Sequence, residues 1–137
     1  MKVRELMTGA PITVSPQTGI FEARQTMLKE RIRHLLVTEG GRMVGIVTDR
    51  DIAIRVVAEG QDPRSVQVGE VISPAVSVGS NATVGEAMGL MRQHDIRRIP
   101  VVDATGRPIG VISLGDLSTS RKARGVLADI SAAPPNN

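Results

Sequence analysis

Hydrophobic and polar residues along the chain follow two periodicities, one helical and one of the β-strand type. Apolar residues recur three or four positions apart in residues 20–27 and 84–91, which predicts two amphipathic helices. Short β-type runs, some joined by Gly-containing turns at 39–42 and 103–107, predict strands and hairpins. The predicted strands are residues 12–14, 35–37, 44–47, 76–78, 99–102 and 109–112. With two further helices beginning at residues 48 and 113, the pattern predicts a mixed α/β (α+β) fold.

The same order of elements occurs twice, because the chain contains an internal repeat. Residues 3–53 match residues 68–118 with an offset of 64 or 65 positions. Each copy predicts a strand, a helix, two strands and a second helix. A unit of about 50 residues buries its own apolar face poorly, so the copies are expected to pack on each other. Identical pairs include Val14/Val78, Met27/Met91, Arg33/Arg97, Gly45/Gly110 and Asp51/Asp116.

The repeat predicts the domain boundaries. The first domain covers residues 3–60, a linker covers 61–67, and the second domain covers 68–130. The linker follows a glycine and contains a proline, which favour the end of a helix. Residues 131–137, which are rich in Ala, Pro and Asn, are expected to form a frayed tail.

The composition is that of a soluble globular protein. Hydrophobic residues make up 41% of the chain, and the mean hydropathy is +0.01. No apolar run approaches the ~20 residues of a membrane-spanning helix, and the first residues contain no hydrophobic leader, so we expect a cytoplasmic protein without a membrane partner. The absence of cysteine excludes disulfides and thiolate sites, and two histidines are too few for an all-histidine site. We therefore expect no metal and no required cofactor.

Arginine carries the positive charge of the chain. The net charge is +3, and the basic residues comprise fourteen Arg and three Lys. Arginine is suited to bidentate recognition of phosphate and carboxylate groups. Phe21 is the sole aromatic residue, so the chain lacks the stacking platform that single-stranded nucleic acid requires. We therefore expect no nucleic-acid partner.

A hydroxyl residue followed three positions later by aspartate ends the last strand of each copy. The first copy has Thr48 and Asp51, and the second has Ser113 and Asp116. One interpretation is a capping box at the start of a helix. The other is a ligand site, because a helix N-terminus and a hydroxyl suit a phosphate, and the aspartate can accept hydrogen bonds from a ribose. The two interpretations are compatible, since one residue can both cap and bind.

A basic pair precedes the central strand of each copy, Arg33 with His34 and Arg97 with Arg98. These residues are either solvated side chains at the start of a strand or, if the copies pack about a pseudo-twofold axis, a convergent group that binds an anion. Their recurrence at the same place in both copies favours the anion site. No nucleophile has an evident base and no carboxylate pair is placed for acid–base chemistry, so the sequence predicts no enzyme and no catalytic residue.

Four segments of the chain carry a family resemblance: Val3–Thr8, Val44–Ile52, Ile96–Asp103 and Gly110–Leu117. Through them the chain resembles a tandem pair of CBS domains, the module named after cystathionine β-synthase and also called a Bateman module. The resemblance extends from residue 3 to about residue 130. It implies two β-α-β-β-α repeats packed through their sheets with pseudo-twofold symmetry, and ligand clefts between the repeats.

The resemblance also implies a function. Family members commonly bind AMP, ADP or ATP, and some bind S-adenosylmethionine or NAD, so it implies a regulatory, signal-transducing module with an adenine nucleotide as ligand. It further implies a homodimer that acts in trans on an unidentified regulated protein. The alternative is a scaffold without ligand, for dimerisation or partner docking. The binding residues that the resemblance implies are Ile12, Thr13, Ala75 and Val76 for adenine, Asp51 and Asp116 for ribose, and Arg33, His34, Thr48, Arg97, Arg98 and Ser113 for phosphate.

Overall fold

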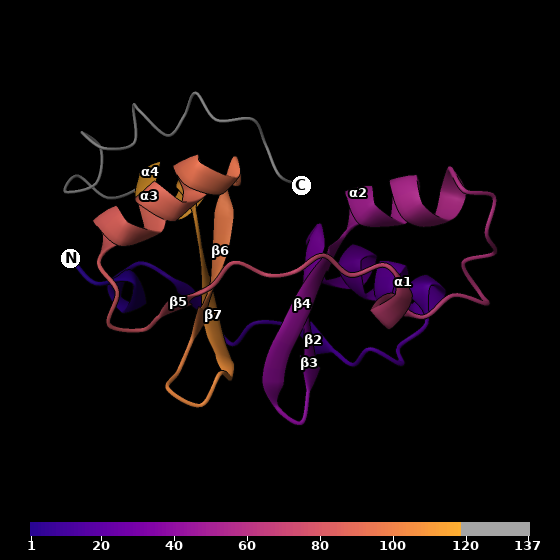
Figure 1. Ribbon diagram of the computed structural model, residues 1–137, viewed down its shortest axis with the longest axis horizontal. Coiled ribbons are helices and arrows are strands. Elements are labelled where there is room, and N and C mark those ends of the chain that lie inside the picture. The colour runs from indigo at the N-terminus through magenta and orange to yellow at the C-terminus, as the bar shows by residue number, and fades with distance from the viewer. Residues whose placement is uncertain (119–137) are drawn as a thin grey trace. The chain divides into compact units, whose positions relative to one another are not determined.

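The computed structural model of the chain describes residues 1–118, which belong to two compact units (Figure 1). The central unit comprises residues 12–75. The described part of the terminal unit comprises residues 1–11 and 76–118. The predicted mixed α/β fold is confirmed, since strands and helices follow one another in the order β-α-β-β-α in each repeat. The predicted tail at 131–137, and the end of the second predicted domain, lie outside the described residues.

The central unit is built on a three-stranded sheet in the order β2-β3-β4. Strand β2 runs parallel to β3, and β3 is antiparallel to β4, with which it forms a hairpin. The helix α2 continues directly into the π-helical turn η2. The elements are β2 (Thr13–Val14), α1 (Ile20–Glu30), β3 (His34–Glu39), β4 (Arg42–Thr48), α2 (Asp49–Ile52), η2 (Ala53–Val57) and η3 (Val68–Glu70).

The described part of the terminal unit repeats this plan with one more strand at the edge, in the order β1-β7-β6-β5. Strand β5 runs parallel to β6, while β1 and β6 are antiparallel to β7. The elements are η1 (Val3–Glu5), β1 (Thr8–Gly9), β5 (Val78–Gly79), α3 (Val84–His94), β6 (Arg98–Val102), β7 (Pro108–Ser113) and α4 (Leu114–Ser118).

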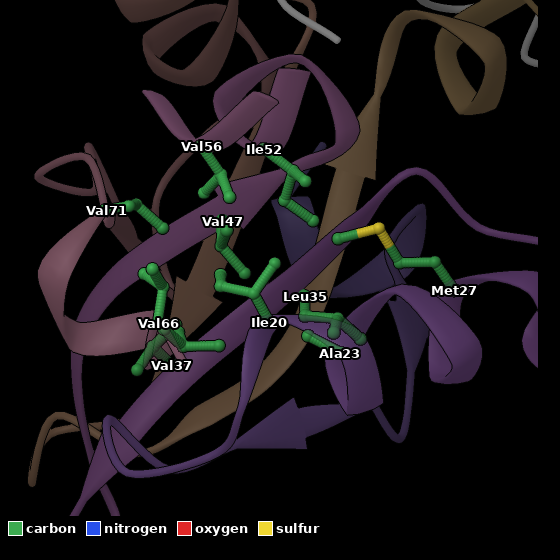
Figure 2. Close-up of a cluster of buried hydrophobic side chains, with 11 residues drawn as sticks. Ile20, Ala23, Met27, Leu35, Val37, Val47, Ile52, Val56, Val66 and Val71 are labelled. Atoms are coloured by element: carbon green, nitrogen blue, oxygen red, sulfur yellow. The ribbon is translucent and has the colours of Figure 1, made fainter. Parts of the chain in front are cut away.

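Each unit has its own hydrophobic core between the sheet and a helix. In the central unit, Ile20, Ala23 and Met27 of α1 are fully buried and recur at helical spacing. They belong to the same cluster as Leu35 and Val47 of the sheet. Figure 2 shows these side chains packed together with Ile52 of α2 and Val56 of η2. In the terminal unit, the corresponding cluster contains Ala87, Met88 and Met91 of α3. The predicted helix periodicity is thus confirmed in both copies. Full burial of each large aliphatic side chain contributes about 1.5–3 kcal/mol.

The compact units do not coincide with the sequence repeats, because the first segment of each repeat packs in the unit formed by the rest of the other repeat. In the terminal unit, Val3 N donates to Ala82 O at 2.9 Å, and Thr8 of β1 pairs with Val111. In the central unit, Val68 N donates to Thr18 O at 2.8 Å. These hydrogen bonds, together with the burial of Val3 and Val68, hold the first segment of each repeat in the unit formed by the other repeat.

Two glycines allow the exchanged segments to approach the sheets. A Cβ at Gly45 of β4 would lie 2.9 Å from the carbonyl oxygen of Ser73, and one at Gly110 of β7 would lie 2.8 Å from that of Thr8. Both distances are shorter than normal van der Waals contact. The identity of Gly45 and Gly110 in the repeat therefore has a packing reason.

The short first strands of the repeats differ from their predicted ranges. The predicted strand at 76–78 is wrong by two residues, since pairing with β6 occurs only at Val78 and Gly79. The predicted strand at 12–14 is shortened to Thr13–Val14, which pairs with Leu36 and Val37. The predicted ranges rest on residue type alone, whereas a residue belongs to a strand only where its backbone pairs with a neighbouring strand.

Candidate functional site

In the central unit, the predicted hydroxyl–carboxylate pair closes the turn between β4 and α2. Asp51 N donates to Thr48 Oγ1 at 3.1 Å, while Thr48 N and Thr48 Oγ1 donate to Asp51 Oδ2 at 2.9 and 3.0 Å. Thr48 is buried, and the Asp51 side chain is 15% exposed. The capping interpretation is therefore confirmed here, and a cap of this kind stabilises a helix by about 1 kcal/mol.

The terminal unit contains the same turn between β7 and α4. Ser113 N and Ser113 Oγ donate to Asp116 Oδ2 at 2.9 and 3.1 Å, and Asp116 N donates to Ser113 Oγ at 3.3 Å. Both side chains are partly buried. The repeat thus reproduces the atomic arrangement as well as the residue types.

Strand register brings one residue of each basic pair beside these turns. His34 lies opposite Thr48 in the β3–β4 ladder, and Arg98 lies opposite Ser113 in the β6–β7 ladder. Opposite residues in an antiparallel pair have Cβ atoms about 4.5–5.5 Å apart and share one face of the sheet. Hydroxyl, carboxylate and basic residue are therefore neighbours within each unit.

The first residue of each basic pair is attached to the helix through the backbone. Asp49 N donates to Arg33 O at 3.0 Å, and Leu114 N donates to Arg97 O at 3.0 Å. The side chain of Arg33 lines a groove beside α1, and neither Thr48 nor Asp51 contributes to the lining of that groove. The side chains of Arg33 and His34 thus lie in different surroundings, because successive side chains of an extended chain point to opposite sides.

Of the residues predicted to border adenine, Thr13 begins β2 and Ile12 directly precedes it, whereas Ala75 and Val76 lie in the irregular segment before β5. Ile12 O accepts from Leu36 N at 3.3 Å, and Thr13 pairs with Leu36. Because β2 is parallel to β3, this is the end of the sheet at which β3 starts and β4 ends. The central unit contains Ile12, Thr13, Arg33, His34, Thr48, Asp51 and Ala75, and the terminal unit contains Val76, Arg97, Arg98, Ser113 and Asp116.

Asp51 has two further neighbours that were not among the predicted site residues. Ser73 Oγ donates to Asp51 Oδ1 at 3.3 Å, and Arg55 Nη1 lies 4.0 Å from the same oxygen. Arg55 Nη1 also donates to the carbonyl oxygens of Val71 and Ile72 at 2.8 and 3.1 Å. A signal for Ser73 was present, because the repeat aligns it with another hydroxyl residue, Thr8.

These contacts define what the Thr48–Asp51 turn can bind. A carboxylate offers about four acceptor positions, and Thr48 and Ser73 occupy three of those of Asp51. One ribose hydroxyl could be added directly, and a second would replace Ser73. The hydroxyl proton of Thr48 is directed at Asp51, so donation to a phosphate requires this hydroxyl to rotate.

The central unit also contains an apolar groove of about 390 Å³ between α1 and the α2–η2 segment. Its borders include Phe21 and Val57, whose side chains are 41% and 65% exposed. The guanidinium carbon of Arg64 lies 4.9 Å from the centre of the Phe21 ring. Arg24, Asp49 and Pro63 also line this groove, whereas Thr48 and Asp51 do not.

Within residues 1–118, no group of three or more His, Cys, Asp or Glu side chains is arranged to hold a metal ion. In the same part of the chain, no helix has the length and apolar character needed to cross a membrane.

Comparison with protein families and relatives gives one consistent result. Residues 3–58 and 68–122 match the sequence profile of the CBS domain. The CBS domain-containing protein YhcV of Bacillus subtilis is 39% identical over 120 residues, which cover 87% of this chain and 84% of that protein.

Solved structures agree with the profile. A CBS domain protein from Pyrobaculum aerophilum complexed with AMP is 28% identical, with a TM-score of 0.83 over 94% of this chain and 99% of that one. A CBS domain pair in complex with 5′-methylthioadenosine and S-adenosyl-L-methionine is 26% identical, with a TM-score of 0.77 over 87% of this chain and 94% of that one.

Proposed function

Because the chain belongs to the CBS-domain family and carries two such domains in tandem, we propose that it is a regulatory module that binds an adenine nucleotide: AMP, ADP or ATP. One observation carries the proposal: each unit places a hydroxyl, a carboxylate and a basic residue together, in the same register, at the end of a hairpin. The related structures with AMP and with S-adenosyl-L-methionine support an adenosine-containing ligand.

The proposed contacts follow the chemistry of each group. Asp51 and Asp116 accept hydrogen bonds from ribose, while Thr48 and Ser113 donate to phosphate. Arg33, His34, Arg97 and Arg98 supply positive charge to the phosphates. The backbone and side chains of Ile12, Thr13, Ala75 and Val76 border the adenine. No residue has a catalytic role, and the module acts as a sensor rather than an enzyme.

We further propose that the module works as a homodimer and regulates a separate protein in trans. Phe21 of α1 and Ile54 and Val57 of η2 are 41%, 49% and 65% exposed. Phe21 and Val57 border the apolar groove, and exposed apolar side chains of this kind favour burial against a second copy of the chain over contact with water. An assembled pair of modules would let ligand occupancy change the surface offered to the regulated protein.

The alternative function is a dimerisation or docking scaffold without ligand. One observation favours it: the capping box and the Ser73 contact together occupy three of the about four acceptor positions of Asp51. In this alternative, the paired aspartates serve helix stability alone.

A thermal-shift series with AMP, ADP, ATP and GTP distinguishes the two functions. A ligand at 100 times its Kd should stabilise the native protein by about 2.7 kcal/mol. We expect stabilisation by at least one adenine nucleotide, with GTP weaker or without effect. If no adenosine compound raises the melting temperature at millimolar concentration, the scaffold is the better description.

A further inference from the structure

Three arginines converge on one groove of the central unit, to which neither Thr48 nor Asp51 contributes. This groove, here called the arginine groove, has a volume of about 360 Å³ and lies beside the C-terminal half of α1. Its charged lining consists of Arg24, Arg31, Arg33 and Asp49. Three guanidinium groups and one carboxylate give it a net charge of +2.

The three guanidinium groups lack partners of their own. Among the described residues, the side chains of Arg24, Arg31 and Arg33 form no hydrogen bond or ion pair. Asp49 accepts a hydrogen bond from Arg50 N at 2.9 Å through Oδ1. Three guanidinium groups around one concavity, with a single carboxylate among them, create a local potential that attracts anions.

The second repeat shows that the fold does not need Arg24 and Arg31. It forms the same corner with the same backbone: Arg31 and Asp95 both have a left-handed conformation, with φ of 56° and 53°. Ile32 N donates to Met27 O at 3.0 Å, and the equivalent Ile96 N donates to Met91 O at 2.9 Å.

The charges of the two corners differ. The repeat aligns Arg24 with Met88, Leu28 with Arg92, Arg31 with Asp95 and Asp49 with Leu114, while Arg33 and Arg97 are identical. The equivalent positions in the second repeat therefore carry two positive charges and one negative charge, a net charge of +1 in place of +2. Arg31 also has a left-handed backbone conformation, for which Gly or Asn is the usual residue. Backbone stability therefore does not explain why an arginine stands at this position.

We propose that the arginine groove binds the phosphate group of a small phosphorylated molecule, at a site that shares Arg33 with the proposed nucleotide site and is distinguished from it by Arg24 and Arg31. A charge of +2 matches the dianion of a phosphate monoester at neutral pH. Guanidinium groups match tetrahedral oxyanions through paired N–H donors. The volume falls within the range of small-molecule sites, and Met27, Leu28 and Ile32 provide an apolar surface for the rest of the ligand.

Calorimetry with pyrophosphate at 0.15 M salt tests this site. We expect wild type to bind, and Arg24→Met and Arg31→Asn each to weaken binding about ten-fold or more, since each removes a charge-assisted contact. Arg31→Asn keeps a residue that tolerates the left-handed backbone. Arg42→Met is the matched control, because it removes one exposed arginine of the same unit outside the groove and should change the affinity less than two-fold.

Two further measurements distinguish binding in the arginine groove from binding at the Thr48–Asp51 turn and from binding of carboxylates. Asp51→Asn should leave pyrophosphate binding unchanged, whatever it does to AMP. The proposal is overturned if wild type does not bind pyrophosphate at millimolar concentration, if Arg42→Met weakens binding as much as Arg24→Met, or if Asp51→Asn abolishes it. Tighter binding of citrate than of pyrophosphate would identify a carboxylate site and contradict the phosphate assignment.

Discussion

His34 lies directly opposite Thr48 in the β3–β4 ladder. The two residues are fourteen positions apart in the chain, yet hairpin register makes their side chains neighbours on one face of the sheet. Thr48 also exchanges hydrogen bonds with Asp51, so an imidazole, a hydroxyl and a carboxylate occupy one corner of the central unit. This arrangement leads to predictions about ligand recognition, and other features lead to predictions about assembly and stability.

The ribose role of the aspartates predicts discrimination between ribose and deoxyribose. A carboxylate that accepts from both ribose hydroxyls should bind 2′-deoxy-AMP more weakly than AMP, by about 1.5–3 kcal/mol or roughly ten- to a hundred-fold, because one charge-assisted hydrogen bond is missing. Asp51→Ala and Asp116→Ala should each lose this preference in their own site. Calorimetry with both nucleotides on wild type and both variants measures it.

Apo stability does not test the ribose role. Removal of either aspartate also removes a first-turn carboxylate, which stabilises a helix by about 0.3–1 kcal/mol with or without a ligand site. Equal affinity of wild type for AMP and 2′-deoxy-AMP, with no effect of either variant, would show that the carboxylates are caps alone.

The homodimer predicts a mass twice that of the 14.6 kDa chain in light scattering. Val57→Lys should shift the protein towards monomer, because it places a charge on an exposed apolar side chain that a second copy would bury. The exposed position means that the fold of each monomer should survive. Val44→Lys, at an apolar side chain of β4 that is 41% exposed, is the control. A wild-type mass of 14.6 kDa at all concentrations would contradict this prediction.

The backbone carbonyl groups of Ser73 and Thr8 lie so close to Gly45 and Gly110 that we expect neither glycine to tolerate a side chain. Gly45→Ala and Gly110→Ala should each destabilise the fold by about 1–3 kcal/mol, since the new methyl group overlaps a backbone carbonyl oxygen that has little freedom to move. Gly79→Ala is the control, because a Cβ at this strand position meets no atom within 4 Å. Urea unfolding of the three variants gives the comparison, and equal losses would show that strand propensity alone matters.

The β6–β7 turn predicts an acid-sensitive contribution to stability. The hydroxyl of Thr105 donates to Asp103 Oδ1 at 2.6 Å, and with the backbone N–H of Arg107 it lowers the pKa of Asp103 below its usual 3.8. A lowered native pKa means that the stabilisation is complete above the unfolded pKa and is lost as the pH falls through the native one. Thr105→Val should raise the pKa of Asp103 towards its usual value, as measured by NMR titration of the carboxyl carbon. An unchanged pKa in this variant would contradict the assigned cause.

The local pattern of the sequence determined the elements and much of the proposed site. Periodic burial of Ile20, Ala23 and Met27 follows from helical spacing, and the aligned pairs Thr48/Ser113 and Asp51/Asp116 were evident from the repeat. Capping boxes involve residues three positions apart, so their geometry is local and can be predicted from residue types.

Tertiary structure alone decided which distant segments meet. Ser73 reaches Asp51, and Arg55 reaches the carbonyls of Val71 and Ile72, because the segment before residue 75 returns to β4. The placement of Val3 beside Ala82, rather than in the unit formed by the rest of its own repeat, has the same origin. The two repeats offer similar surfaces to similar segments, and the pattern of apolar residues is the same for either pairing. Only the packed chain, with its loop lengths and its close contacts at Gly45 and Gly110, selects one of them.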